Sequence, residues 1–297
     1  MDTEPLNHDP LVEVGQANDL ARDLLVIPNL GVELVPNIGV IGGDHSVLVV
    51  ETGLGPRNAE QVLAFASAYA KGRKLYLTTT HFHPEHAFGA QAFAGKATYL
   101  INRTQAADLE AKGPAYLEMF RTLGPHIARH LEDVHLGTPD TIYNDTHELD
   151  LGGRTVQLRA TGRAHSKGDQ VVTVPDAGVL FTGDLVEAGQ FAIFPWFPPY
   201  DVDVSGLDWL EVMHRLIATA PQTVVPGHGD ISGPQLLADV RDYLESLRDE
   251  TWKRRDSAMP LETMTAEIKS LMIERHPQWT GQSWIEKGVA CLCTEHP

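Results

Sequence analysis

The chain has 297 residues, of which 42% are hydrophobic and 21% are charged, and its formal net charge is −17. This length and composition are typical of a soluble globular protein with one large domain or two ordinary ones. The negative charge argues against nucleic acid as a partner and disfavours an anionic membrane surface, because phosphate groups bind to basic protein surfaces.

Two features indicate the compartment. Residues 1–5 are acidic and polar, without the apolar stretch of a signal peptide or a membrane span, so we expect a cytoplasmic protein. Cys291 and Cys293 are the only cysteines, which excludes a disulfide framework. On a strand they would lie on one face, and we interpret them as small buried hydrophobic residues, with a C-x-C metal site as the alternative.

The first third of the chain is predicted to be rich in strands. Residues 1–22 show no clear pattern and are interpreted as a loosely attached lead-in. A helix is predicted with Asn58 as its N-cap, running through Ala70, with Gly72 just past its end. Short apolar runs bounded by turn residues predict strands at 24–28, 32–35, 38–41, 46–50, 74–80 and 97–100.

Residues 102–148 are mainly helical in pattern, with breaks at Gly113-Pro114 and Gly124-Pro125. We interpret them as a helical insert, which either covers the functional site as a lid or packs on the sheet. His126 and His130 lie on this insert, where they could approach a substrate.

The remainder alternates strands and helices. Strands are predicted at 155–158, 171–174, 178–182 and 223–225, and helices at 205–218, from Pro234 and at 261–274. The helix after Pro234 has the apolar stripe Leu236, Val240, Tyr243, Leu244 and Leu247. We find no linker, and therefore expect a single α/β domain over 1–297 with a helical C-terminal extension at 258–297. The order of elements predicts two packed sheets with helices outside.

The motif H-x-H-x-E-H at residues 81–86 is the most informative stretch of the chain. Its side chains leave the C-terminal end of the predicted strand 74–80 and enter a loop before a helix from Ala87. Neutral imidazole and carboxylate are ligands that catalytic zinc and iron sites use. Because such a loop can direct several side chains at one point, the motif indicates a metal site.

Three later stretches share one construction, in which a turn-forming glycine and a ligand-type side chain adjoin a predicted strand. They are 161–166 with His165, 181–184 with Asp184, and 225–229 with His228. Each alone is weak evidence, since Gly-Asp after a strand is ordinarily a turn. Together with the H-x-H-x-E-H motif, and in this order, they are specific.

With these motifs the chain resembles the metallo-β-lactamase superfamily over roughly residues 30–250, and most closely its stand-alone hydrolases with glyoxalase II-like ligands. The phrases R-A-H-x-x-G-D at 163–169 and V-P-G-H-G at 225–229 carry the resemblance. It implies a four-layer αββα sandwich with the site at one edge, where strands end.

The resemblance also implies a dinuclear metal site. The first metal would be held by His81, His83 and His165. The second would be held by Glu85, His86 and His228, and Asp184 would bridge the two. We expect Glu85 and Asp184 to be essential for catalysis.

This ligand set predicts a hydrolase. Six terminal ligands and one bridging carboxylate leave each metal an open position, as in catalytic sites. Two Zn²⁺ ions per chain (Fe or Mn being the other candidates) would generate hydroxide near neutral pH and polarise a carbonyl oxygen. No nucleophile motif such as G-x-S-x-G is evident. We expect metal-bound hydroxide to cleave a carboxylic ester, thioester, lactone or amide of a small molecule.

The main alternative is an oxidoreductase similar to the mononuclear iron persulfide dioxygenases of the same superfamily. Those enzymes use one histidine of the H-x-H pair, the later histidine and the aspartate. Presence here of Glu85, His86 and His228 as second-site ligands favours the dinuclear hydrolase. The acidic charge disfavours a nuclease, the missing signal peptide disfavours a secreted β-lactamase, and the complete ligand set disfavours a non-enzymatic binding protein.

Two carboxylates depart from the family pattern. Aspartate is usual at the positions of Glu85 and Glu51, so both side chains are longer by one methylene. Fixing the additional torsion of Glu85 costs side-chain entropy, and Pro84 limits how far the loop can retreat. We therefore expect the second metal to bind more weakly than the first.

Substrate clues come from residues 191–200, which hold five aromatic residues and three prolines soon after Asp184. This loop either walls an apolar pocket or anchors a long crossing segment. With the net charge of −17, whose field repels anions, it predicts a partly apolar substrate without a large negative charge. The sequence leaves the oligomeric state open, a homodimer included.

Overall fold

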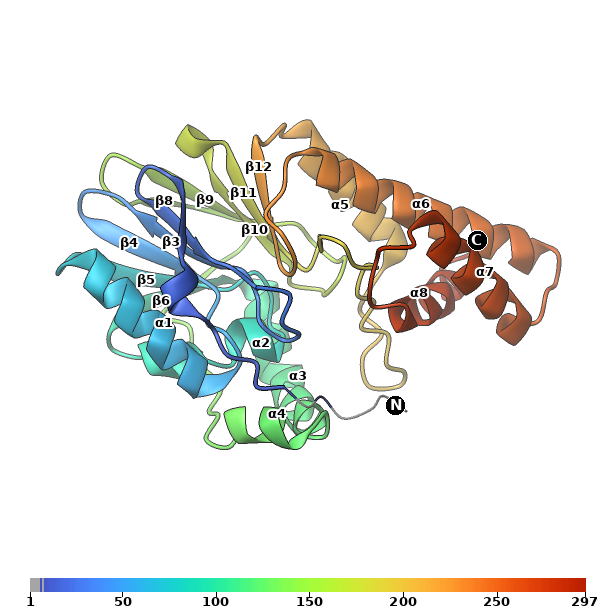
Figure 1. Ribbon diagram of the computed structural model, residues 1–297, viewed down its shortest axis with the longest axis horizontal. Helices are drawn as coiled ribbons and strands as arrows, with labels where there is room; N and C mark the ends of the chain where they lie inside the picture. Colours follow the sequence, from blue (N-terminus) through green and yellow to red (C-terminus); the bar gives the residue numbers. More distant parts are fainter. Residues whose placement is uncertain (1–5, 7) are drawn as a thin grey trace.

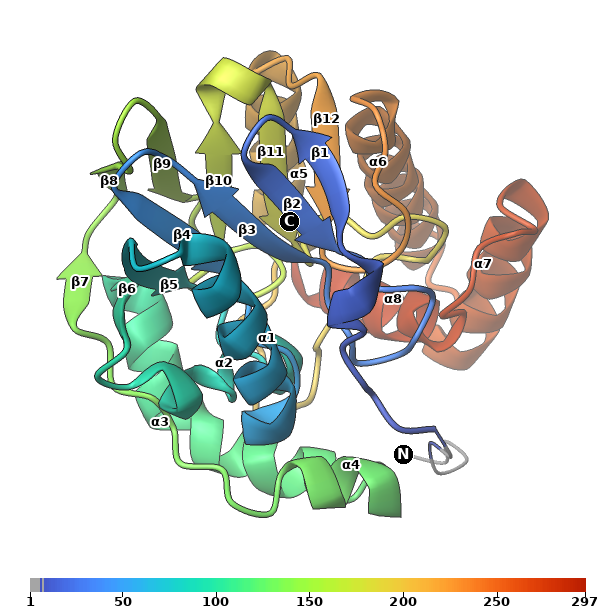
Figure 2. The ribbon, with the colours of Figure 1, turned by 60° about the vertical axis from the view of Figure 1, so that its left-hand side comes forward.

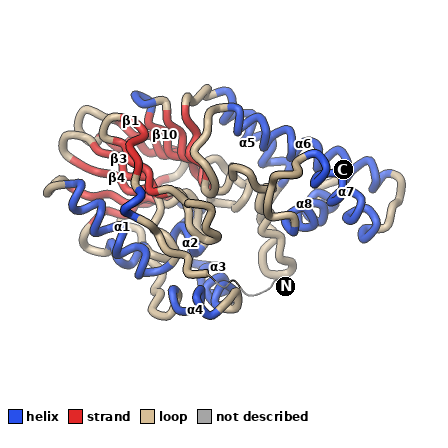
Figure 3. The backbone as a smooth tube through the Cα atoms, viewed as in Figure 1, coloured by secondary structure: helices blue, strands red, loops and turns tan. Residues whose placement is uncertain are grey.

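Two β-sheets face each other in the middle of the fold, and helices cover the outer face of each sheet (Figure 1). The computed structural model describes residue 6 and residues 8–297. Strands occupy the centre and helices the outside, as Figure 3 shows by secondary structure. The predicted four-layer αββα sandwich is confirmed.

The first sheet has seven strands in chain order. They are β1 (Asn18–Ala21), β2 (Leu24–Ile27), β3 (Ile38–Gly42), β4 (Ser46–Val50), β5 (Lys74–Thr78), β6 (Ala97–Asn102) and β7 (Thr141–Tyr143). Strands β1 to β4 pair antiparallel, whereas β4 to β7 pair in parallel. Every residue of β3 and β4 is buried, because both faces of these strands are covered.

The second sheet has five strands in the order β12-β11-β10-β9-β8. They are β8 (Thr146–Asp150), β9 (Thr155–Ala160), β10 (Gln170–Val174), β11 (Val179–Gly183) and β12 (Thr223–Pro226). Only β11 and β12 pair in parallel. Leu48 and Val50 of the first sheet pack against Leu158 and Val172 of the second in a core between the sheets.

Helices form the outer layers, as Figure 2 shows from a second direction. They are α1 (Gly55–Ala70), α2 (Pro84–Ala87), α3 (Arg103–Arg121), α4 (Pro125–His130), α5 (Gly206–Ala218), α6 (Gln235–Asp256), α7 (Leu261–Arg275) and α8 (Ser283–Thr294). Short 3-10 helices occur at η1 (Val14–Gln16), η2 (Ala90–Phe93) and η3 (Pro175–Ala177). Val62 of α1 packs on the first sheet, and Trp209 of α5 and Val240 of α6 pack on the second.

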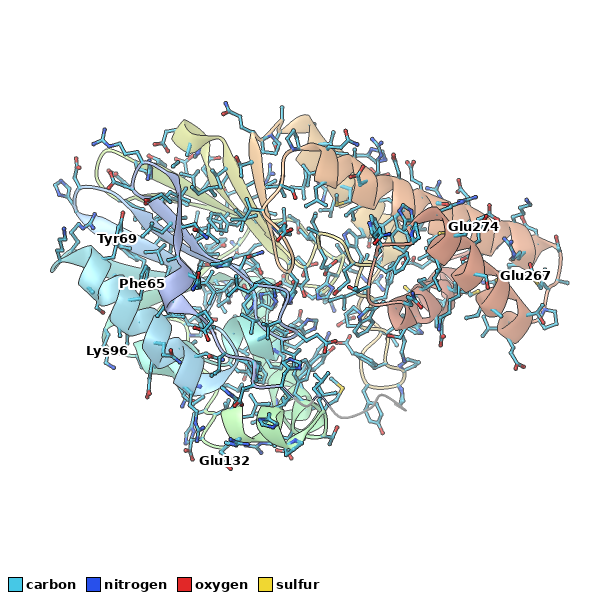
Figure 4. All side chains as sticks on the ribbon, viewed as in Figure 1. Phe65, Tyr69, Lys96, Glu132, Glu267 and Glu274 are labelled. Atoms are coloured by element: carbon cyan, nitrogen blue, oxygen red, sulfur yellow. The ribbon has the colours of Figure 1, made fainter. Side chains whose placement is uncertain are left out.

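The C-terminal helices continue the layer formed by α5 and α6. Helices α7 and α8 pack against α6, away from the first sheet (Figure 1). An ion pair of 3.0 Å joins Arg254 Nε of α6 to the carboxylate of Glu267, which Figure 4 labels on α7. The predicted helices at 205–218, after Pro234 and at 261–274 are confirmed, and all five residues of the stripe after Pro234 are buried.

Several local predictions are wrong. Residues 32–35 form a turn, because the side chain of Asn29 bonds Val32 and Val35 carbonyl oxygens and Leu34 takes a φ of 60°. The predicted insert at 102–148 is helical only through His130 and then supplies β7 and β8, whose largely exposed faces left a weak strand pattern. Cys291 and Cys293 lie on helix α8, within the predicted C-terminal extension, rather than on a strand.

The lead-in is attached more firmly than predicted, although its residues 1–5 and 7 lie outside the described part. Asn58 lies inside α1, which begins at Gly55 with Pro56 in its first turn, so it is not the N-cap. Its buried side chain accepts from the Val12 amide at 3.0 Å and donates to the Pro10 carbonyl at 2.7 Å. Strand β1 then adds the lead-in to the first sheet. Among the described residues, no helix is long and apolar enough to cross a membrane.

Candidate metal centre

Two groups of metal-ligand side chains meet where β5, β11 and β12 end. The first cluster is His81, His83 and His165, and the second cluster is Glu85, His86, Asp184 and His228. Within each cluster the potential ligand atoms lie within 4.8 Å of one another, and all seven residues are buried. These are the seven predicted ligand residues, and the structure brings all of them together.

Asp184 lies between the clusters and faces both. One carboxylate oxygen, Oδ2, is 3.8 Å from Nε2 of His81 and 3.8 Å from Nε2 of His165. The other oxygen, Oδ1, is 3.2 Å from Nε2 of His86 and 3.6 Å from Nε2 of His228. This two-sided arrangement is what a bridging carboxylate requires.

Backbone carbonyls orient two of the histidines. Nδ1 of His165 lies 2.9 Å from the carbonyl of Ile193, and Nδ1 of His228 lies 3.0 Å from that of Val35. Because a carbonyl can only accept, Nδ1 carries the hydrogen in both rings and Nε2 presents its lone pair to the cluster. Orientation of a metal-binding imidazole by such a partner is the usual arrangement in metal sites.

Glu51 and Thr80 orient two more histidines. The Thr80 hydroxyl donates to Glu51 at 2.5 Å and lies 3.1 Å from Nδ1 of His81, whose N–H it can accept. Nδ1 of His86 lies 3.3 Å from the Glu51 carboxylate. Glu51 is therefore a supporting residue behind the cluster, and its longer side chain reaches both Thr80 and His86.

The charge states fit metal binding in the first cluster. Burial, followed by the charge of nearby His86, holds the pKa of His81 well below its usual value, and burial with nearby His165 does the same to the pKa of His83. Burial also lowers the pKa of His165. Neutral imidazoles are the form that binds a metal ion.

Two ligands of the second cluster, Glu85 and His86, hold protons more tightly, whereas the pKa values of Asp184 and His228 are lowered. Burial raises the pKa of Glu85 to about 7. Burial alone would lower the pKa of His86, but the carboxylates of Asp184 and Glu51 outweigh it and raise this pKa well above the usual value. Burial alone would raise the pKa of Asp184, but His86 and His228 hold it well below its usual range.

Unpaired atoms test whether the residues present fit a metal ion. Buried side-chain atoms without a hydrogen-bond partner include Glu85 Oε2, His86 Nε2 and Asp184 Oδ1. In the first cluster Nδ1 of His83 lies 3.0 Å from Nε2 of both His81 and His165, so three ring nitrogens converge on one point. Nitrogens bound at about 2.0–2.1 Å to one tetrahedral zinc are separated by about 3.4 Å, close to this spacing. The two clusters therefore fit a dinuclear metal site.

Other predicted contacts turn out differently. His126 and His130 pair with Asp9 at 3.2 and 3.3 Å and so hold the lead-in against α4. In the loop 191–200, Phe191 and Phe194 are fully buried in the core around α6, whereas Tyr200 is 86% exposed. The anchoring interpretation is correct for these two phenylalanines.

Sequence reasoning missed the supporting residues. Thr80 and Tyr116 contact first-cluster histidines, and Asn37 bonds the carbonyls of Pro226 and Gly229 on either side of His228. Glu187 is buried beyond Asp184, and burial together with the Asp184 charge raises the pKa of its carboxyl well above the usual value. Glu187 follows the predicted ligand Asp184 by three positions. This short distance in the sequence was the signal that could have identified Glu187 as a supporting residue.

Comparison with known proteins gives relatives of two kinds. The chain is 26% identical over 221 residues to the human acyl-coenzyme A thioesterase MBLAC2, a match covering 68% of this chain and 75% of that protein. It is 29% identical over 117 residues to the metallo-beta-lactamase type 2 of Bacteroides fragilis, covering 37% of this chain and 45% of that protein.

Solved structures share the fold. A metallo-beta-lactamase from Pontibacter korlensis matches with a TM-score of 0.61 at 17% identity, covering 77% of this chain and 98% of that one. The sec-alkylsulfatase Pisa1 from Pseudomonas sp. matches with a TM-score of 0.71 at 16% identity, covering 92% of this chain and 49% of that one. The glyoxalase II-like branch stays a hypothesis. The sequence model of the metallo-beta-lactamase superfamily matches residues 31–228, and the chain belongs to this superfamily.

Proposed function

We propose that the protein is a metal-dependent hydrolase with two zinc ions per chain, which cleaves a carboxylic ester or thioester of a small molecule, lactones and amides being related substrates. The position of Asp184 carries this proposal. Its two carboxylate oxygens face separate ligand clusters, with contacts of 3.2 to 3.8 Å to four histidines. A mononuclear site would need only one of these clusters.

The proposed roles follow from the positions of the side chains. When bound, a pair of zinc ions supplies an activated water near neutral pH and polarises a carbonyl oxygen. Asp184 would hold the two cations at a fixed spacing and neutralise part of their charge. Glu85 would supply the second anionic ligand of the second cluster. The carbonyls of Ile193 and Val35 keep His165 and His228 in the tautomer that can bind.

One observation supports the type of bond, and a second limits the charge of the substrate. A relative at 26% identity is named an acyl-coenzyme A thioesterase, which supports thioesters as a substrate class. The net charge of −17 opposes a large anionic carrier such as coenzyme A. We therefore propose a partly apolar, weakly charged small-molecule ester or thioester, rather than a nucleic acid or a membrane component, as the substrate.

Metal analysis followed by a substrate screen tests the proposal. The purified protein should contain close to two zinc ions per chain and should hydrolyse members of a panel of esters, thioesters, lactones and lactams. Asp184→Ala is the control variant and should be inactive on the same panel. One iron ion per chain, with oxygen consumption on a persulfide substrate, would replace the hydrolase by the dioxygenase alternative.

A further inference from the structure

His83 differs from the other four histidines of the metal centre. A carbonyl, a hydroxyl or a carboxylate lies beside the Nδ1 atom of His81, His86, His165 and His228. His83 instead directs Nδ1 at the first cluster, and its Nε2 is buried without a hydrogen-bond partner. No polar group among the described residues therefore fixes the orientation of this ring.

An aromatic ring takes the place of that polar group. The ring of Tyr116, on helix α3, stacks on His83 with a centroid distance of 4.9 Å and an angle of 21° between the planes. Phe82 closes a second side, with its ring 5.0 Å from that of Tyr116 and 4.7 Å from that of His83. Stacking on a flat ring restricts rotation of the imidazole about its side-chain torsions.

The Tyr116 ring is itself held in place. Its hydroxyl donates to Oδ2 of Asp201 at 2.7 Å, and the same carboxylate receives the Lys112 ammonium at 3.0 Å. Lys112 also pairs with Asp203 at 2.7 Å. Asp201 is only 6% exposed, so this charge-assisted network lies largely out of water and joins α3 to the segment after β11.

We propose that Tyr116 is a positioning residue for the first metal, acting through the face of His83, with Asp201 and Lys112 fixing Tyr116. This proposal rests on the metal centre of the proposed function. Under this proposal, helix α3 of the predicted 102–148 insert supports one ligand of the metal centre. A stacked aromatic ring of this kind stabilises one orientation of its partner by about two- to tenfold.

Three variants separate the ring from its hydroxyl and from general packing. Tyr116→Phe keeps the stacked ring and loses only the contact with Asp201. Tyr116→Met fills much of the same volume without a flat ring. Ile127→Ala truncates a fully buried residue of the same apolar cluster on a different helix, α4, and controls for a loss of stability.

The measurement is metal affinity, without substrate. Metal-free protein is titrated with Zn²⁺ against a chromophoric chelator, and the first and second binding steps are resolved. Tyr116→Met should weaken the first step by about three- to tenfold and leave the second within about twofold. Tyr116→Phe and Ile127→Ala should leave both steps within about twofold. The ring protons of His83 should be shifted upfield by the stacked ring in the NMR spectra of the wild type and of Tyr116→Phe.

The outcomes distinguish failure of the proposed metal centre from failure of the proposed role of Tyr116. A wild type that binds no zinc tightly overturns the metal centre and this inference together. A wild type that binds two ions, with a first step unchanged in folded Tyr116→Met or equally weakened in Ile127→Ala, overturns only the role of Tyr116. If Tyr116→Met does not fold, Tyr116→Leu, which also lacks a flat ring, replaces it with the same expected loss in the first step. No loss there overturns the inference, as does an unshifted His83 resonance.

Discussion

Lowering the pH from 8 to 6 should weaken binding of the second metal ion and leave binding of the first nearly unchanged. Metal ions compete with protons for their ligands, so the side with the higher pKa values is the side that pH affects. The pKa of Glu85 is raised to about 7 by burial. Burial holds the pKa values of His81 and His83 well below their usual value and also lowers the pKa of His165, so protons compete with a metal ion less in this cluster.

The magnitude follows from the Glu85 pKa. With a pKa of about 7, the carboxylate is about nine-tenths ionised at pH 8 and about one-tenth ionised at pH 6. Proton competition at this one group should therefore weaken the second binding step about tenfold over the two pH units. His86, whose pKa the carboxylates of Asp184 and Glu51 raise against the effect of burial, adds to the loss in the same direction.

Variants of Glu85 isolate the contribution of this residue to binding of the second metal ion. Glu85→Gln should lose the second metal and most activity, because it removes the anionic ligand. Glu85→Asp should keep the site with equal or higher affinity, since one torsion fewer is fixed, which is about 0.5 kcal/mol or a factor of two to three. The assay is a zinc titration against a chelator at pH 6, 7 and 8. Two equally tight steps with no pH dependence, together with weaker binding in Glu85→Asp, would show that the loop is built around glutamate and refute the reasoning.

Two further predictions rest on the geometry of the metal centre and a third on the net charge of the chain. Asp184→Ala should remove most bound metal and all measurable activity, a larger loss than His228→Ala causes, as metal analysis and a rate assay on both variants would show. Gly227→Ala should lower metal content in a protein that circular dichroism shows to be folded, because the new methyl group would collide with Asp184 Oδ1. A neutral thioester should be hydrolysed faster than the matched coenzyme A thioester, judged by kcat/KM at low salt, and a clear preference for the anionic substrate would contradict the charge argument.

The metal centre could be predicted from the sequence because each ligand adjoins a local sequence pattern. His81, His165 and His228 each lie next to a turn or the end of a strand, and such positions are fixed by short-range pattern. The residues that orient these ligands carry no such signal. Ile193 and Val35 act through backbone carbonyls, which any residue could supply, so only the fold reveals them.

The errors in secondary structure also have physical causes. In β8 only Leu149 is buried, so the alternation that identifies a strand is nearly absent from its sequence. Asn58 has the chemistry of an N-cap but uses it to bond Val12 and Pro10, residues more than 40 positions away in the chain. Contacts with distant parts of the chain determine the structure of β8 and the role of Asn58. Such contacts cannot be read from a single sequence.

The elements outside the sandwich bear on the metal centre, which supports the proposal that residues 1–297 form one domain. Ile193, whose carbonyl orients His165, lies between Phe191 and Phe194, which are buried among residues of α6 and α8. The Phe191 amide bonds the carbonyl of Thr280, just before α8. A ligand of the first cluster is thus oriented by a loop that the C-terminal extension anchors. The superfamily match ends at residue 228, so the loop lies within the matched region, whereas the helices α6 and α8 that anchor it lie outside.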